Sequence, residues 1–139
     1  MIARDPVALG LPHREPFIFL DEVLTLTPGE RGTATKAFPP GTPFFSGHFP
    51  GDPLVPGVIL TEALAQLSGI VAGQRGRALR LAAIKGMKFR RAVRPAEVIA
   101  LSAEKSGNSG GLWQFMVEAR VDGEVVAEGV IVLAEPPVT

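Results

Sequence analysis

The chain has 139 residues, 46% of them hydrophobic, and its 14 basic and 14 acidic residues give a formal net charge of zero. This length predicts one domain, residues 1–139, with a core of ordinary size. The balanced charge argues against a general attraction to nucleic acid or to a membrane surface. The chain has no cysteine and only two histidines, which excludes disulfides and cysteine-type zinc sites and argues against a multi-histidine metal site.

Nothing in the sequence indicates export or a membrane span. The first ten residues lack the apolar core of a signal peptide. The longest apolar run is interrupted by Glu62 and Gln66 and falls short of the ~20 residues that a span needs. We therefore expect a cytoplasmic protein.

The first third of the chain predicts two strands. Residues 17–28 are rich in β-branched and aromatic side chains, and residues 33–38 alternate, so both segments read as strands. The glycines and proline of residues 28–32 predict the turn between them. A loop rich in glycine and proline follows.

Residues 58–72 predict a helix. Pro56 suits the first helical turn, and Gly73 marks the end. Apolar side chains cover nearly every side of this segment, which is typical of a helix buried in a core.

The second half of the chain predicts a meander of four strands. Residues 81–93 form the first, with Gly86 as a bulge. A loop is expected at residues 106–111, and a tight hairpin at residues 122–123 joins the last two strands. The sum is an α+β fold, an antiparallel sheet curled around one long central helix. Its exposed edges suggest pairing into a homodimer.

The loop and the helix carry the candidate catalytic groups. His48 lies among glycines and apolar residues, and an imidazole suits a general base near neutral pH. Glu62 and Gln66 share one face of the apolar helix, where a carboxylate needs a partner or a proton. Gly57 opens the helix, where a free N–H could bind a substrate carbonyl. A structural loop histidine and a glutamate that reaches the surface remain the alternatives.

Basic residues gather in one stretch of the chain. Eight of the 14 lie between residues 75 and 94, with no acidic residue among them. A solvated strand face is the simple interpretation, and an acidic protein partner is the functional one that we prefer. Nucleic acid is disfavoured because the stretch contains one aromatic residue, Phe89.

These residues occur in segments that resemble a known family. The run GHFPGDPLVPGVILTEALAQ, together with LPHREPFIFLDEV, KFRRAVRP and LWQFMVEARVDGEVVAEG, resembles the 3-hydroxyacyl-[acyl-carrier-protein] dehydratases of bacterial type II fatty acid synthesis. The resemblance covers residues 9 to 134. It implies the hot-dog fold, a dimer or trimer of dimers, an acyl thioester on acyl carrier protein and no cofactor.

The resemblance also implies roles for particular residues. His48 matches the catalytic histidine and Glu62 the catalytic carboxyl, which in this family meet across two subunits. Gly57 matches the glycine whose N–H binds the thioester carbonyl, and we expect Phe49, Pro56 and Gln66 to contact the substrate as well. Since the carrier is acidic, six residues of the basic stretch are expected to bind it, namely Arg75, Arg77, Lys85, Lys88, Arg90 and Arg91.

Some positions depart from the family pattern. Glu15 stands where an aromatic is common, and Asp52 resembles the related dehydratase/isomerase branch, although Glu62 is the choice of enzymes that only dehydrate. Ala92 and Ala96 replace a commoner proline and glycine. The expected reaction is the dehydration of (3R)-3-hydroxyacyl-[acyl-carrier-protein] to the trans-2-enoyl form. The alternatives are a hot-dog acyl thioesterase and a non-catalytic subunit that binds acyl carrier protein. His13, in LPHREPF, is expected to buttress a turn.

Overall fold

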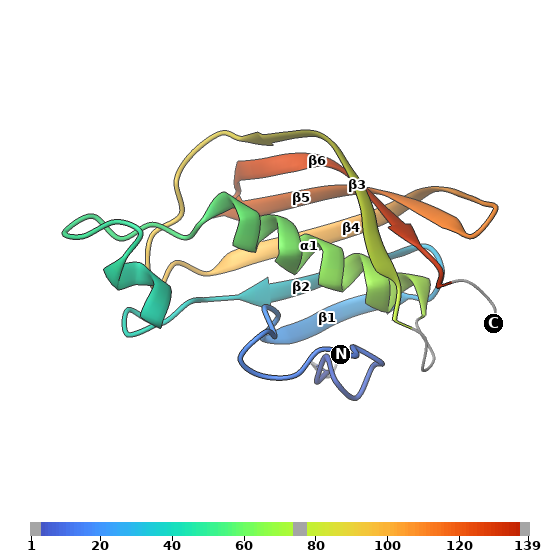
Figure 1. Cartoon of the computed structure of the whole chain (residues 1–139), viewed down its shortest axis with the longest axis horizontal. Helices are drawn as coiled ribbons and strands as arrows, with labels where there is room; N and C mark the ends of the chain where they lie inside the picture. Colours follow the sequence, from blue (N-terminus) through green and yellow to red (C-terminus); the bar gives the residue numbers. More distant parts are fainter. Residues whose placement is uncertain (1–3, 74–77, 137–139) are drawn as a thin grey trace.

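A computed structural model describes residues 4–73 and 78–136 of the chain. One helix lies across one face of a curled antiparallel sheet (Figure 1). The strands stand in the order β1-β2-β4-β5-β6-β3, and every neighbouring pair is antiparallel. This arrangement confirms the predicted α+β class and the hot-dog fold. The elements are β1 (Glu22–Thr27), β2 (Arg31–Lys36), the 3₁₀ turn η1 (Pro43–Ser46), α1 (Gly57–Ala72), β3 (Arg80–Phe89), β4 (Ile99–Ser109), β5 (Leu112–Val121) and β6 (Glu124–Ala134).

Helix α1 lies almost entirely in the core. Its side chains from Leu60 to Val71 are buried with the exception of Glu62. The helix begins at Gly57, one residue after Pro56, and ends at Gly73, whose φ of 78° gives the left-handed turn that glycine adopts readily. The fully apolar helix is therefore wrapped by the sheet, as its sequence pattern predicts.

Three predicted boundaries in the sheet were wrong. The first strand begins at Glu22 rather than residue 17, because the segment before it crosses the helix and bonds to Gln66. β4 ends at Ser109 and β5 begins at Leu112, so only Gly110 and Gly111, both with positive φ, lie between them. The expected loop at residues 106–111 is therefore a two-residue turn. The expected strand of residues 81–93 ends at Phe89.

The order of the last four strands also differs from a simple meander. β4, β5 and β6 follow one another, but β3 pairs with β6 at the far edge of the sheet. The bulge near Gly86 is present, because the register shifts between Lys85 and Lys88. The Asp122-Gly123 turn between β5 and β6 is also present. β1 and β3 are thus the two edge strands of the sheet, and Arg4 forms an isolated bridge with Val23 on the outer edge of β1.

A core substitution tests the enclosure of α1. Leu64 is completely buried at the centre of the helix, so Leu64→Ala should lower the free energy of unfolding by about 2–5 kcal/mol. Urea unfolding at fixed protein concentration measures this change. Met116 on β5 is 58% exposed, and Met116→Ala should cost less than about 1 kcal/mol. Equal losses in the two variants would contradict the burial of the helix.

Candidate active site

His48 lies in a tight loop just before the helix. Its Nδ1 is 3.1 Å from the carbonyl oxygen of Leu54, and the Leu54 N–H donates back to the His48 carbonyl at 2.8 Å. A carbonyl can only accept, so Nδ1 carries a proton and Nε2 of the neutral ring is left with a free lone pair. The ring of Phe49 stacks on the imidazole at 4.1 Å between centroids. The loop thus presents an oriented base.

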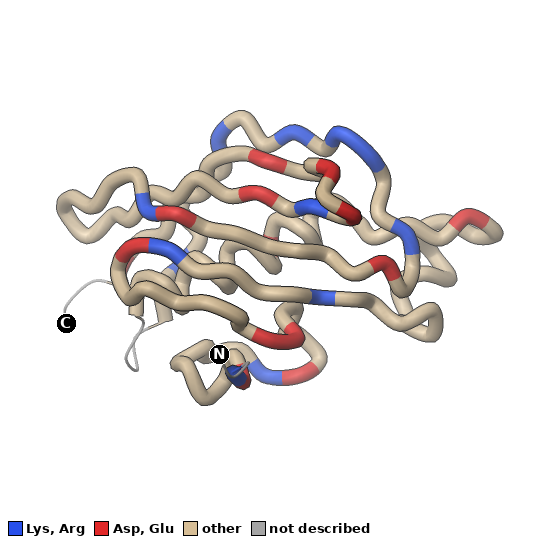
Figure 2. The backbone as a smooth tube through the Cα atoms, turned by 180° about the vertical axis from the view of Figure 1, so that it is seen from behind, with Lys and Arg blue, Asp and Glu red and all other residues tan. Residues whose placement is uncertain are grey.

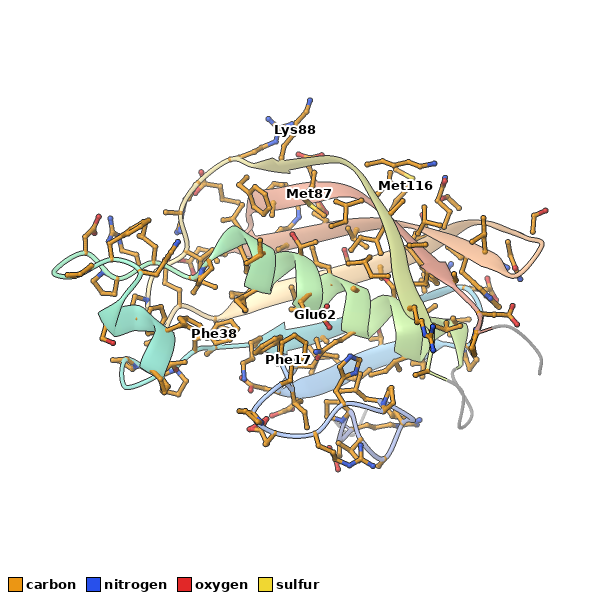
Figure 3. All side chains as sticks on the ribbon, in the orientation of Figure 1. Phe17, Phe38, Glu62, Met87, Lys88 and Met116 are labelled. Atoms are coloured by element: carbon orange, nitrogen blue, oxygen red, sulfur yellow. The ribbon has the colours of Figure 1, made fainter. Side chains whose placement is uncertain are left out.

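Glu62 is held by side chains on two elements. Its Oε2 accepts a hydrogen bond from the Gln66 amide at 3.1 Å and lies 3.4 Å from Nε2 of His13. The Glu62 side chain is 21% exposed, so this side chain is only partly buried. Figure 3 shows Glu62 on the helix, with Phe17 just below it in the view.

Gln66 uses its whole amide within the chain. It is 1% exposed. Its Oε1 accepts from the Phe19 N–H at 2.9 Å, and its Nε2 donates to the Phe17 carbonyl at 3.0 Å as well as to Glu62. Both amide hydrogens are therefore engaged. This geometry suits a residue that holds Glu62 and the N-terminal segment. The substrate contact expected for Gln66 stays a prediction.

The first turn of α1 offers a backbone donor. Among the described residues no acceptor takes the Gly57 N–H, and the positive end of the helix dipole lies there. A Cβ at Gly57 would lie 3.0 Å from the Phe89 ring, so only glycine fits this position without a shift. The preceding Pro56 accepts the first hydrogen bonds of the helix from Ile59 and Leu60. The contact between Gly57 and Phe89 could not be predicted from the sequence, because no local pattern indicates that two residues so far apart in the chain lie together.

The two catalytic candidates stand apart within one chain. His48 bonds to Leu54 and stacks on Phe49, whereas Glu62 bonds to Gln66 and faces His13, and among the described residues no hydrogen bond or ion pair joins His48 to Glu62. A cavity of about 60 Å³ adjoins Glu62, with His13 and Gln66 on its polar side. Its other walls are apolar, from Ala65, Leu79, Leu81 and Leu133.

Comparisons with known proteins place the chain in a family. A model of the FabA-like domain matches residues 11–130. The 3-hydroxyacyl-[acyl-carrier-protein] dehydratase FabZ of Ruminiclostridium cellulolyticum is 43% identical over 138 residues, which cover 96% of this chain and 97% of that protein. The chain belongs to the 3-hydroxyacyl-[acyl-carrier-protein] dehydratase family. FabZ of Acetivibrio thermocellus is also 43% identical, over 89% of this chain and 88% of its own.

Solved structures share the fold of this dehydratase-family chain. The dehydratase heterocomplex ApeI:P from Xenorhabdus doucetiae has a TM-score of 0.80 at 20% identity, and the match covers 96% of this chain and 93% of that one. A hypothetical thioesterase from Streptococcus pneumoniae, solved with coenzyme A, has a TM-score of 0.67 at 14% identity and covers 83% and 84%. At these identities the likeness shows the hot-dog fold alone.

The basic stretch is only partly free in this member of the family. Figure 2 shows basic residues along β3 and the segment after it, and acidic residues on the neighbouring strands. Arg90 forms an ion pair with Glu128, and Arg91 with Glu97 and Glu124. The predicted Arg75 and Arg77 lie outside the described residues. No described acidic residue pairs with Lys85 or Lys88; Lys85 donates to the neutral Gln114.

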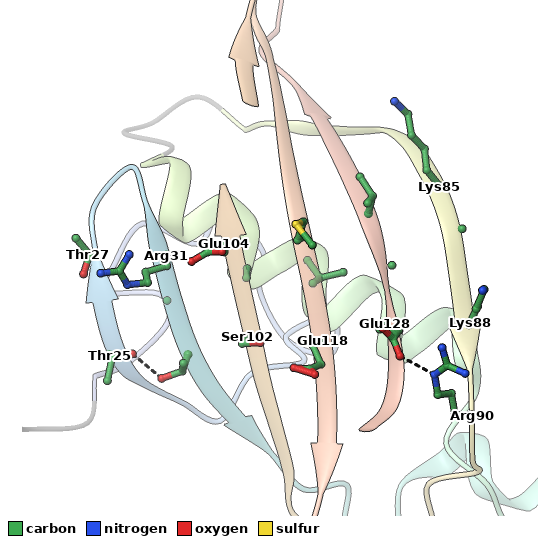
Figure 4. Close-up of a pocket in the computed structure, with 18 residues that line it drawn as sticks. Thr25, Thr27, Arg31, Lys85, Lys88, Arg90, Ser102, Glu104, Glu118 and Glu128 are labelled. Carbon is green, nitrogen blue, oxygen red and sulfur yellow. Dashed lines mark hydrogen bonds and ion pairs between the residues drawn. The ribbon is translucent and has the colours of Figure 1, made fainter. Parts of the chain in front are cut away.

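The outer face of the sheet, away from the helix, carries a larger hollow of about 960 Å³. Figure 4 shows Lys85 and Lys88 on β3, and Arg90 just after it, along one side of this hollow, with Glu104 on β4, Glu118 on β5 and Glu128 on β6. Neither His48 nor Glu62 lines this hollow. The catalytic candidates therefore lie on the helix side of the sheet.

The turn of residues 91–97 fixes the loop that carries His48. The Val55 N–H donates to the Val93 carbonyl at 2.8 Å, and Arg94 pairs with Asp52 at 2.9 Å. Glu97 closes this turn by accepting from both terminal nitrogens of Arg91 and from the Arg94 N–H. The hydrogen bonds from Arg91 and Arg94 hold the pKa of the Glu97 carboxyl below its ordinary value, and Glu97 in turn raises the pKa of Arg91.

This turn makes stability depend on pH. Because the pKa of Glu97 is lower in the folded chain, its contribution is present above the ordinary carboxyl value and is lost as pH falls through the folded value. Glu97→Gln should therefore lower the thermal midpoint at pH 7, and its deficit relative to the unmodified chain should disappear at strongly acid pH. Glu22→Gln, an exposed change on β1, is the control and should cause no such deficit. A deficit that persists unchanged in acid would contradict the ionic role of Glu97.

Proposed function

We propose that this chain removes water from (3R)-3-hydroxyacyl-[acyl-carrier-protein] and produces trans-2-enoyl-[acyl-carrier-protein] in fatty acid biosynthesis. The activity is that of a hydro-lyase, the class named for relatives that match nearly the whole chain at 43% identity. The observation that carries the proposal is the contact of His48 Nδ1 with the Leu54 carbonyl, because it leaves Nε2 available as a base.

The proposed reaction divides the work between two groups. Nε2 of His48 removes the proton from C2 of the thioester, and the C3–O bond breaks as the double bond forms. Glu62 gives a proton to the departing hydroxyl, which leaves as water. The Gly57 N–H stabilises the negative charge that develops on the thioester oxygen. Proton exchange with solvent then restores His48 and Glu62.

The separation of His48 and Glu62 supports a site shared by two copies of the chain. The structure around them carries exposed apolar side chains, including Val58 at 75% and Phe49 at 50% on the helix side, and Phe89 at 50% on the edge strand β3. A free edge strand and exposed apolar residues are features that a second copy would cover. We therefore propose a homodimer in which His48 of one copy meets Glu62 of the other. A trimer of dimers stays a prediction from the resemblance.

We propose that Lys85 and Lys88, which form no ion pair with a described residue, bind acyl carrier protein. Acyl carrier protein is acidic in the family that the chain resembles. Lys85 and Lys88 lie on the outward side of β3, and no described carboxylate of this chain pairs with either lysine. Arg90 and Arg91 already face carboxylates of this chain, so they offer less net charge to a partner. Among the described residues, no helix is long and apolar enough to cross a membrane.

Hydration of a trans-2-enoyl thioester on acyl carrier protein, followed by mass spectrometry, tests the reaction in its reverse direction. The unmodified chain should add one water. His48→Ala and Glu62→Gln should each lower the rate by about 10²-fold or more, because each removes one proton-transfer group. Release of free acid would instead identify a thioesterase. Carrier binding without turnover at any chain length would identify a non-catalytic subunit.

A charge reversal tests the carrier surface. Lys88→Glu should raise the KM for the carrier-bound substrate by about three- to tenfold at low salt, because it weakens electrostatic attraction to an acidic partner. Its kcat should be retained, and so should its rate on a short pantetheine thioester. Arg31→Glu makes the same charge change on exposed β2, away from β3, and serves as the matched control. Equal effects from the two reversals would mean that Lys88 has no special part.

A further inference from the structure

His13 is a titratable group beside the site that the proposed reaction does not use. It comes from the N-terminal segment, and its Nε2 lies 3.4 Å from Oε2 of Glu62. The segment is fixed in place by the bonds of Gln66 to Phe17 and Phe19. Arg14 also binds the carbonyls of Leu11 and His13 at 3.0 and 2.8 Å. The imidazole is therefore placed against Glu62 by several independent bonds.

The other ring nitrogen of His13 shows which tautomer is present. Nδ1 is buried, and among the described residues it has no hydrogen-bond partner. A proton on Nδ1 would be a buried N–H without an acceptor, which costs free energy. An unprotonated nitrogen at that place costs less free energy. The neutral ring therefore carries its proton on Nε2, the nitrogen that faces Glu62.

Two donors then point at the same oxygen of Glu62. The Gln66 amide donates to Oε2 at 3.1 Å, and the His13 Nε2–H faces Oε2 at 3.4 Å. The His13 distance is longer than a closed hydrogen bond, and such contacts commonly tighten when substrate binds. Among the described residues, His13 and Glu62 are the only ionisable side chains that line the cavity beside this pair, and its other described walls are Gln66 and the apolar Ala65, Leu79, Leu81 and Leu133. An oxygen that accepts one hydrogen bond and faces a second donor has little room for a proton of its own.

We propose that His13, together with Gln66, is a positioning residue for Glu62: the two donors reserve Oε2 as an acceptor and place the transferable proton on Oε1. This inference rests on the proposed function, because the proton on Oε1 is the one that Glu62 gives to the departing hydroxyl. His13 itself does not touch the reacting atoms.

Two amide replacements separate this role from simple packing. In His13→Gln the amide nitrogen stands as many bonds from Cβ as Nε2 of histidine, and in His13→Asn it stands where Nδ1 does. His13→Asn should lower kcat by about tenfold, because it removes one hydrogen bond to a carboxyl that becomes charged as it gives up its proton. His13→Gln should keep most of the activity, and KM should stay within about twofold in both because the orienting contact is to Glu62 rather than to substrate. Equal kcat values in the two variants, or a rise in KM instead of a fall in kcat, would overturn the proposal.

The tautomer is measured without any turnover. A long-range ¹H–¹⁵N correlation spectrum of the full, substrate-free chain, recorded where the ring is neutral, should show His13 protonated on Nε2 and bare at Nδ1. A ring protonated on Nδ1 in a chain with normal hydration activity would overturn the role of His13 and leave the proposed function intact. The expected tautomer in a chain that never turns over would support the His13–Glu62 pair and overturn the proposed function.

Discussion

Helix α1 has apolar side chains on nearly every side. Exposing these side chains to water would be unfavourable, so the sheet has to cover the helix. The close approach of the sheet is visible at Gly32 on β2, where a Cβ would lie 3.0 Å from the Val71 side chain. The helix can therefore lie against the strand without a gap. Enclosure also explains why so few polar groups occur on the helix, and why those that do occur have defined partners.

Two of the polar side chains on α1, Glu62 and Gln66, belong to the candidate site. Gln66 is fully buried and satisfied by the backbone at Phe17 and Phe19, which ties the N-terminal segment across the helix. Removing that amide would leave two backbone groups and a carboxyl without their partner. The same amide orients Glu62. One buried side chain thus links the stability of the fold to the placement of the acid.

Much of the fold follows from the sequence because its signals are local. The apolar run of α1, the glycine that ends it and the Asp122-Gly123 turn each act within a few residues. The pairing of β3 with β6 could not be read in this way, because the chain offers no local signal for which strand lies beside which. The predicted strand of residues 17–28 began too early for a related reason, since the partner of its first part is Gln66, far along the chain.

The site shows the same division. His48, Glu62 and Gly57 stand in one short stretch, so their residue types and spacing could be recognised together. His13 was expected to support a turn, and only the folded chain places it 3.4 Å from Glu62. Ion pairing was likewise invisible in the sequence: Glu128, the partner of Arg90, and Glu124, a partner of Arg91, both lie on β6, far along the chain. Long-range partners decide these roles, and a charge run alone does not reveal them.

We propose that His48 and Glu62 act together across two copies of the chain, because no described hydrogen bond or ion pair joins them within one copy. Mixing two inactive variants tests it directly. His48→Ala and Glu62→Gln chains, unfolded together and refolded, would form mixed dimers in which one of the two sites has both native groups. The account predicts recovery of about one quarter of the unmodified hydration activity, as random pairing into two-fold dimers requires. No recovery, with mixed dimers demonstrated by mass spectrometry, would contradict a site shared between two copies.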